Sequence, residues 1–160
     1  MKEQKTMTKE IRLTQNKFAL VDDDDFERIN IKKYHAVKLG RCFYAYKWSR
    51  GKNISMHRDI LQALPGEMVD HINGNGLDNR KENLRMCNKA QNRINSGLQK
   101  NNTSGYKGVY LQCTSKKYIA HITVNKKCVH LGIFEDPIEA ALSYDEAARK
   151  YHGIFARTNF

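Results

Sequence analysis

Apolar and polar residues alternate in several short stretches of the chain, and this alternation predicts β-strands. In residues 41–48, RCFYAYKW, aromatic and apolar side chains recur along a short run. The segment KYIAHITVN has a strict period of two, which is typical of a strand with one buried and one open face. Its apolar set and its more polar set are Tyr118, Ala120, Ile122 and Val124, and Ile119, His121, Thr123 and Asn125.

Helical signals are strongest in the segment EDPIEAALSYDEAARKYHG. Asp136 is a suitable N-cap, Pro137 suits the first helical position, and Glu139 completes a capping box. Gly153 is the expected stop, and several alanines would let the helix lie close on a sheet. We therefore expect residues 104–160 to form three strands packed under one helix.

The N-terminal part of the chain gives weaker signals. Residues 1–16 are polar and are expected to fray. The acidic run from Asp22 to Asp25 predicts a solvated turn, while a metal loop is the alternative; the run lacks the spaced ligands and the glycine of a calcium loop. The segment NISMHRDILQALPGEM predicts a strand end and a short helix that stops at Pro65 and Gly66.

Charge narrows the class of partner. Lys and Arg total 28 against 17 Asp and Glu, which gives a formal net charge of +11. This balance favours a polyanion, most of all nucleic acid, although a merely soluble basic protein stays open. No run approaches the roughly 18 apolar residues of a membrane span, and the first residues have no apolar core of a signal peptide. We expect a cytoplasmic protein that does not bind membranes.

The four cysteines are not spaced for a metal site. No C-x-x-C pair occurs, and no histidine lies at zinc-finger spacing from such a pair. We therefore expect no zinc, and reduced, mostly buried thiols.

The stretch VDHINGNGLDNRKENLRMCNKAQNRIN combines an Asp-His pair, a loop rich in Asn and Gly, a short apolar run and helical spacing. Its pattern predicts a strand ending at Val69, with Asp70 and His71 at its mouth, a second strand in ENLRMC, and a helix from the cap Asn88 to about Ile94.

This arrangement can support hydrolytic chemistry. Asp70 and Asn92 can face each other across the hairpin and offer the hard oxygen ligands of Mg²⁺ or Mn²⁺. His71 would lie beside the metal and take a proton from water, while Asn83 could hydrogen-bond near it and fix its orientation. His57 is interpreted as a packing residue.

The ordered set VDH, NG, NLR and Asn92, preceded by His57-Arg58, resembles the HNH nucleases, in particular phage homing endonucleases of the ββα-metal fold in an HNN variant. The resemblance covers roughly residues 54–95. It implies that His71 is the general base, that Asn83 positions it, and that Asp70 and Asn92 bind the metal. The last position is Asn rather than His, which bears on metal affinity. Arg85, Lys89 and Arg93 are expected to contact DNA.

The segment from about Ser104 to Phe160 resembles the AP2/ERF-type DNA-binding domain of plant ethylene-response factors, through YKGV, LGIF, EAALSYDEAARKYHG and the terminal NF. The family lays its three-stranded sheet in the DNA major groove. Most arginines and tryptophans of the plant pattern are absent, so sequence specificity does not transfer. A protein-interaction module is the alternative. The residues implied to contact DNA are Lys107, Tyr110, Gln112, Lys117, His121, Thr123 and His130.

Together these patterns predict an α+β chain in four parts: a strand-rich region (1–55), an HNH nuclease (56–95), a linker (96–103) and an ERF-type DNA-binding domain (104–160). We expect a metal-dependent endonuclease that hydrolyses phosphodiester bonds in double-stranded DNA, encoded by a phage or mobile element, and monomeric in a bacterial host cell. The alternative is a non-catalytic DNA-binding regulator that retains a dead HNH fold.

Overall fold

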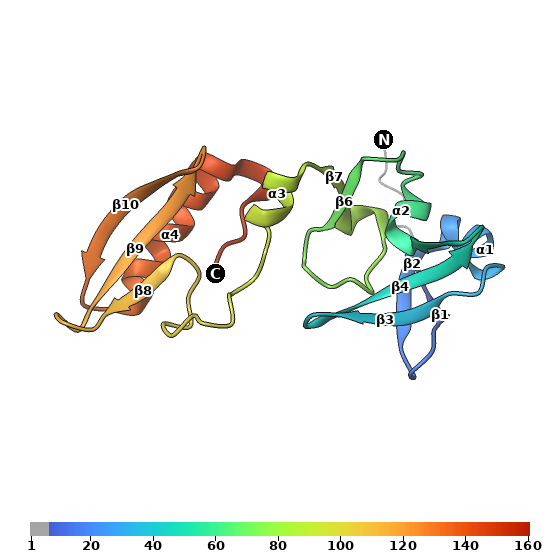
Figure 1. Ribbon diagram of the computed structural model, residues 1–160, viewed down its shortest axis with the longest axis horizontal. Helices are drawn as coiled ribbons and strands as arrows, with labels where there is room; N and C mark the ends of the chain where they lie inside the picture. The colour runs from blue at the N-terminus through green and yellow to red at the C-terminus, as the bar shows by residue number, and fades with distance from the viewer. Residues whose placement is uncertain (1–6) are drawn as a thin grey trace. The chain divides into compact units, whose positions relative to one another are not determined.

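The computed structural model describes residues 7–160, which form two compact units, the first ending at Lys89 and the second beginning at Ala90 (Figure 1). Within these residues the chain forms small antiparallel sheets and four α-helices, so the expected mixed α+β class is confirmed. None of the described helices has the length and apolar character that crossing a membrane requires.

The first unit begins with a two-stranded hairpin, β1 (Thr8–Arg12) and β2 (Phe18–Asp22). Ile11, Ala19 and Val21 are almost fully buried, so one face of the hairpin packs into the core. The expectation that residues 1–16 fray is therefore wrong for residues 8–12, because a strand with one apolar face gains stability from a partner that the local pattern does not show. Residues 1–6 of that expectation lie outside the described residues.

The acidic run continues the chain as a helix rather than as a solvated turn. Helix α1 (Asp23–Asn30) begins directly after β2, with three carboxylates in its first turn, where the helix dipole favours negative charge. Asp25 is buried and pairs with Arg28 at 2.6 Å and with Lys81 at 2.8 Å. Among residues 7–160 no group of three or more acidic, His or Cys side chains is placed to hold a metal ion.

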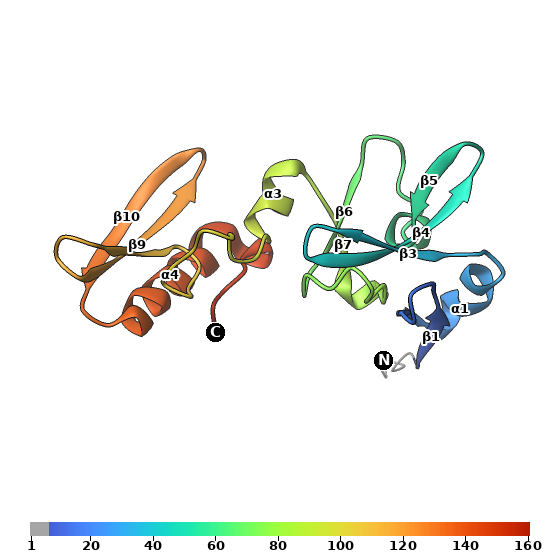
Figure 2. The same cartoon turned by 60° about the horizontal axis from the view of Figure 1, so that its bottom comes forward.

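A three-stranded sheet follows in the order β3-β4-β5, and Figure 2 shows it from another side. The short helix α2 starts directly after β5, and its buried Met56 and Ile60 join the core of the first unit. This helix ends before Pro65, as expected. The bounds are β3 (His35–Leu39), β4 (Cys42–Ser49), β5 (Lys52–Ser55) and α2 (Met56–Ile60).

The hairpin of the predicted nuclease segment pairs β6 (Met68–His71) with β7 (Leu84–Cys87). Leu84 packs in the same core as Val21, Ile29 and Met56. The hairpin and the strand-rich region before it therefore share one hydrophobic core, and the four-part division of the chain stays a prediction.

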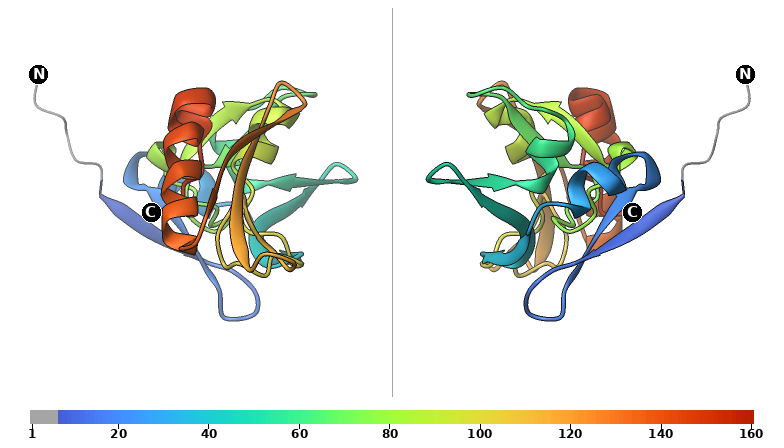
Figure 3. Two further views of the ribbon diagram at one scale, coloured as in Figure 1. Left: turned by 90° about the vertical axis from the view of Figure 1, so that its left-hand side faces the viewer. Right: turned by 90° about the vertical axis from the view of Figure 1, so that its right-hand side faces the viewer.

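The second unit contains the sheet β8-β9-β10 with α4 on one face (Figures 1 and 3). Ala140, Ala141 and Ala148 are completely buried against the sheet, and Asp136 caps the helix by accepting a hydrogen bond from the Ile138 N–H at 2.9 Å. The expected three strands under one helix are confirmed. The bounds are α3 (Lys89–Ile94), β8 (Val109–Gln112), β9 (Lys117–Val124), β10 (Lys127–Phe134) and α4 (Pro137–His152).

The last residues of the chain are tied to the middle of α4. Asp145 is fully buried and accepts hydrogen bonds from the backbone N–H groups of Asn159 and Phe160 at 2.8–2.9 Å, and from Nδ2 of Asn159 at 2.9 Å. Asn159 in turn bonds both backbone polar groups of Lys107. The terminal Asn-Phe is therefore a structural clamp.

The expectation of mostly buried thiols is wrong. All four cysteines are free, two of them, Cys113 and Cys128, are exposed, and Cys42 and Cys87 are half-buried. Cys128 lies in β10, on the face of the sheet that α4 does not cover, and Cys113 lies in the turn directly after β8.

Candidate nuclease site and DNA-binding face

Asp70 and His71 are the last two residues of β6 rather than residues beyond its end. The side chains are 7% and 5% exposed. In the register of the hairpin, Asp70 lies opposite Arg85 and His71 lies opposite Leu84. Successive residues of a strand point to opposite faces of the sheet, so the side chains of these two neighbours have different surroundings.

Asp70 forms an ion pair across the hairpin. Its Oδ2 accepts from Nε of Arg85 at 3.1 Å and from Nη2 at 2.8 Å, and both side chains are about nine-tenths buried. Arg85 was expected to contact DNA, and that role stays a prediction. In the structure, Arg85 binds the carboxylate of Asp70, which was predicted to bind the metal.

The imidazole of His71 lies among aromatic rings supplied by the preceding sheet and helix. The ring of His57, from α2, contacts it edge-on with centroids 4.8 Å apart, and Tyr44, from β4, does so at 5.8 Å. Ser55 Oγ lies 3.1 Å from Nε2 of His57. His57 is therefore a packing residue as expected, but it packs directly on the candidate base.

Burial decides the protonation of both imidazoles. It lowers the pKa of His71, although the bond to Asn79 and the charge of Asp70 partly oppose the shift. Burial, with the neighbouring His71 and Arg58, lowers the pKa of His57 to about 3. Both rings are therefore neutral at pH 7, and a neutral imidazole can accept a proton.

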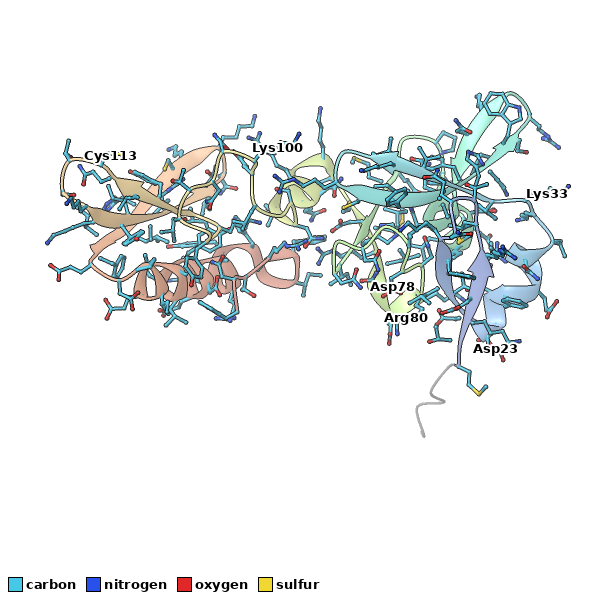
Figure 4. All side chains as sticks on the ribbon, turned by 90° about the horizontal axis from the view of Figure 1, so that it is seen from below. Asp23, Lys33, Asp78, Arg80, Lys100 and Cys113 are labelled. Carbon is cyan, nitrogen blue, oxygen red and sulfur yellow. The ribbon has the colours of Figure 1, made fainter. Side chains whose placement is uncertain are left out.

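The loop between the strands is held by its own amide and acidic side chains. Asn73 Nδ2 donates to Asp78, and Arg80 binds both carboxylate oxygens of Asp78 at 2.8 Å. Figure 4 shows Asp78 and Arg80 side by side. The Asn and Asp side chains of this loop thus supply hydrogen bonds that fix its conformation.

Asn83 lies at the end of a 3-10 turn, η1 (Lys81–Asn83), and not within the second strand as expected. Its Oδ1 accepts from the Asn73 N–H at 2.9 Å, and its Nδ2 donates to the Asp78 carbonyl at 2.7 Å. Asn83 therefore braces both sides of the loop, and its predicted role in positioning His71 would act through that loop.

Sequence analysis did not identify Asn79 as a residue of the candidate site. It is 1% exposed, and its Oδ1 lies 3.3 Å from Nε2 of His71. Within the Asn-rich loop no local signal separates this amide from its neighbours. A buried amide can be found only when the fold of the loop is known.

The loop is docked on the first hairpin of the chain. The Leu20 N–H donates to the Leu77 carbonyl and the Asn79 N–H donates to the Leu20 carbonyl, both at 2.8 Å. The N–H of Lys81 donates to Asp22 at 2.7 Å. Residues 18–22, to which sequence reasoning gave no role in the site, therefore fix the position of the loop.

Helix α3 has the predicted bounds, but it straddles the boundary between the two units. Asn92 is half-buried and belongs to the second unit, whereas Asp70 belongs to the first, so their pairing at a metal stays a prediction. Lys89 and Arg93 are exposed and four residues apart, and such residues share one side of a helix. Their predicted DNA contacts stay predictions too.

The face of the C-terminal sheet opposite α4 brings together most of the residues implied to contact DNA. Gln112 lies opposite Lys117, and His130 lies opposite His121 in the strand register. The ring of Tyr110 contacts His121 edge-on at 5.3 Å, and Lys117 pairs with the exposed Glu135 at 3.1 Å. We call this set the open face: Tyr110, Gln112, Lys117, His121, Thr123 and His130.

Lys107 lies apart from the open face. It precedes β8, and its Nζ donates to the carbonyls of Ile94 at 2.5 Å and Ser96 at 2.8 Å. Burial lowers the pKa of this ammonium to about 8. Its predicted phosphate contact stays a prediction, but the ammonium is engaged in holding residues 94–96.

Comparisons with known proteins agree with both resemblances. Residues 63–94 match the family model of HNH endonucleases. The chain is 33% identical to Protein 3.8 of Escherichia phage T7 over 106 residues, which are 63% of this chain and 87% of that protein. It is 29% identical to an uncharacterized HNH endonuclease of Acanthamoeba polyphaga mimivirus over 148 residues, 89% of this chain and 74% of that protein.

The third match concerns a plant protein. The chain is 37% identical over 86 residues, 52% of its length, to an ethylene-responsive transcription factor of Medicago truncatula, of which the match spans 32%. With the geometry above, these matches place the chain in the class of nuclease-like proteins that carry a sheet-and-helix domain of a DNA-binding type. It belongs to the HNH endonuclease family, and part of the chain is similar to a plant ethylene-responsive transcription factor.

Proposed function

We propose that this protein is a metal-dependent DNA endonuclease of the homing type, which hydrolyses phosphodiester bonds in double-stranded DNA. The observation that carries the proposal is the environment of His71. The imidazole is buried beside Asp70, packed between aromatic rings, and neutral at pH 7 because burial lowers its pKa.

In the proposed reaction, His71 takes the proton of the attacking water. Its packing against His57 and Tyr44 limits rotation of the ring, so the nitrogen that accepts the proton keeps one direction. Positioned general bases typically contribute about 10²–10⁴-fold in rate. Asn83 supports this step by holding the loop next to the ring.

The proposed metal ligands are Asp70 and Asn92. A carboxylate and an amide oxygen fit Mg²⁺ or Mn²⁺, which prefer oxygen ligands and keep part of their coordination sphere for water and phosphate. A bound ion would supply charge stabilisation for the scissile phosphate and the leaving oxygen. Arg85 competes for the same carboxylate oxygen, since it binds Oδ2 of Asp70.

The proposed DNA-binding surface of the second unit is the open face. Lys117 can pair with a phosphate, and Gln112 can read an adenine edge in the major groove. The net charge of +11 supports a polyanionic partner. The match to a transcription factor and the arrangement of the side chains both support this assignment.

A plasmid-nicking assay with purified wild-type protein and the His71→Ala variant tests the proposal. Wild-type protein is expected to nick supercoiled DNA when Mg²⁺ is present, and His71→Ala to lose about 10²–10⁴-fold in rate while it binds DNA normally. Binding of both proteins is measured by fluorescence anisotropy. Wild-type nicking rates in His71→Ala at saturating Mg²⁺ would contradict the proposed role.

The Asp70–Arg85 ion pair favours a second candidate, a non-catalytic DNA-binding regulator, because an Arg that keeps the carboxylate would exclude the metal. Mn²⁺ binding followed by electron paramagnetic resonance separates the two candidates. An endonuclease is expected to bind Mn²⁺, and to lose this binding in Asp70→Ala. A chain that binds DNA but takes up Mn²⁺ equally poorly with and without Asp70 is a regulator.

A further inference from the structure

The far end of the β4–β5 hairpin is a two-stranded ribbon that takes no part in the candidate nuclease site. Strand β3 pairs with β4 only at residues 42–46 of β4, and from Lys47 onward β4 pairs with β5 alone. The hairpin turn is tight, with positive φ angles of 48° at Arg50 and 75° at Gly51. We call residues 47–54 the ribbon, and Figure 3 shows it extending away from the other elements of the first unit.

The ribbon lies in a strongly basic part of the chain. Residues 28–58 contain nine Lys and Arg residues and neither Asp nor Glu. Near the base of the ribbon, Lys47 pairs with Asp59, which follows this stretch. Arg50 and Lys52 at the tip are exposed, and neither forms an ion pair within residues 7–160. The tip therefore carries uncompensated positive charge, which attracts a polyanion.

Trp48, the single tryptophan of the chain, lies on this ribbon and is 66% exposed. Its cross-strand partner Asn53 is exposed as well, and the residues between them are polar or glycine, so the tip offers no apolar patch for a protein partner. An aromatic ring beside free cations suits nucleic acid, because the cations bind phosphates and the ring stacks on bases.

Trp48 also shares a face of β4 with a residue of the candidate site. Side chains at every second position of a strand point to the same face, so Trp48 lies on the face of Tyr44, whose ring contacts His71. The four residues of strand between them span roughly 13 Å. This length corresponds to about four base-pair steps of a duplex. A short DNA segment bound at His71 is therefore long enough to reach the ribbon.

We propose that the ribbon is a DNA-contacting finger of the first unit, in which Trp48 stacks on a base beside the cleavage position and Arg50 and Lys52 bind phosphates. Insertion of a side chain between base pairs partly unstacks them and is a general means of bending DNA. The inference rests on the proposed nuclease function, because it places the contact next to the candidate base. The ribbon is separate from the open face, which belongs to the second unit.

The fluorescence of Trp48 tests the contact directly, because no other tryptophan contributes to the signal. The full-length protein is titrated with a short DNA duplex in the presence of EDTA, which prevents metal-dependent cleavage, and binding is followed in parallel by the anisotropy of labelled DNA. Stacking is expected to quench the indole emission and to protect it from acrylamide as binding approaches saturation. Unchanged emission and unchanged access of acrylamide at saturating DNA overturn the inference.

Variants of the ribbon test its contribution to affinity. Trp48→Ala is expected to weaken DNA binding by about 5–100-fold, and Trp48→Phe, which keeps a ring, to weaken it less. The combined variant Arg50→Ala, Lys52→Ala should lower the log-log salt slope by about two, since two phosphate contacts are lost. The matched controls are Leu64→Ala, a 65% exposed apolar residue, and Lys33→Ala, an exposed lysine, both in the first unit and outside the ribbon.

Wild-type affinity in Trp48→Ala together with a wild-type salt slope in the combined variant also overturns the inference. These substitutions change exposed residues, and urea unfolding verifies that each variant is folded. The proposed nuclease function fails separately. Quenching of Trp48 by DNA without any nicking of plasmid would keep the ribbon contact and contradict the nuclease, whereas nicking without a change in Trp48 emission would keep the nuclease and contradict the ribbon contact.

Discussion

Gly76 lies in the loop between β6 and β7, where this loop packs against β4. A Cβ atom at this position would lie 2.4 Å from Cδ1 of Tyr44 and 2.5 Å from the Phe43 carbonyl oxygen. The backbone on one side of the clash belongs to a paired strand and cannot yield easily. The absence of a side chain at Gly76 therefore permits the loop to lie against Tyr44, which in turn contacts His71.

We expect Gly76→Ala to destabilise the first unit by about 1–3 kcal/mol, as overpacking usually does, and to lower the nicking rate by displacing Tyr44 and the loop. Urea unfolding and the plasmid assay measure the two effects. Gly97→Ala is the control, because its Cβ would meet nothing closer than 3.8 Å. Equal stability of the two variants would show that the loop can move away from β4 without cost.

His57 gives the first unit a distinctive response to acid. The pKa of His57 is about 3 in the folded protein against the ordinary 6.5, so the unfolded chain binds more protons between these values. The stability that comes from a neutral His57 is complete above pH 6.5 and is lost as the pH falls toward 3. The lowered pKa of His71 acts in the same direction.

We expect the free energy of unfolding to decrease from pH 6.5 to pH 4, and to decrease less in His57→Phe, which keeps an aromatic ring but does not titrate. Urea unfolding, followed by NMR signals of residues in the first unit, measures both. The contribution of Asp59, whose pKa is lowered to about 2 by its bonds to Lys47, Tyr34 and Lys32 despite burial, is lost only at lower pH. Parallel curves for the two proteins would assign the acid response to other groups.

At the scale of elements, the clamp between α4 and the chain end stabilises the second unit. Asp145→Ala would leave the N–H groups of Asn159 and Phe160 without their acceptor. We expect this change to cost about 2–3 kcal/mol, as measured by urea unfolding. Glu146→Ala, which alters an exposed neighbour on the same helix, should change stability little. A similar loss in both variants would mean that the clamp contributes nothing specific.

Sequence patterns identified those elements whose signals are local. The period of two in β9, the cap at Asp136 and the Asn-Gly loop each arise from neighbouring residues, and the structure contains all three. The first hairpin was not predicted because it has few apolar residues, and these are buried in a core that they share with residues distant in the sequence.

The same reasoning explains which parts of the site were found. Asp70 and His71 form a recognisable pair in the sequence, whereas Arg85 and Asn79 acquire their partners through strand register and loop folding. Contacts between residues 59 apart, such as the bond from Lys81 to Asp22, leave no local pattern to detect.

At the scale of the whole molecule, DNA affinity should fall steeply with salt. Each phosphate contact that is lost should reduce the log-log salt slope by roughly one. The combined variant Lys117→Ala, Thr123→Ala, His130→Ala on the open face is expected to bind more weakly and to lower the slope by about one, since a single lysine is removed. Fluorescence anisotropy over a range of salt concentrations measures this. Lys150→Ala, an exposed lysine of α4, should leave the slope closer to the wild type.

The DNA-binding surface could also be tested by a chain truncated near Asn101, but the combined open-face variant is the cleaner test. The carbonyls of Ile94 and Ser96 are bound by Lys107, and that of Asn95 by Arg157 at 3.4 Å, so residues 94–96 lose these partners when the chain is cut near Asn101. If unchanged affinity and slope were found for the open-face variant, the sheet of the second unit would not be the DNA-binding surface.

The docking of the nuclease loop on β2 also bears on how the chain avoids aggregation while it is being made. Strand β2 pairs with β1 along one edge, and the backbone of Leu20 on its other edge is covered by Leu77 and Asn79. A nascent chain that has not yet reached residue 77 presents that edge uncovered, and exposed strand edges recruit other chains. The loop that follows the candidate catalytic residues Asp70 and His71 therefore also protects the first hairpin, and fragments that end before it should be prone to associate.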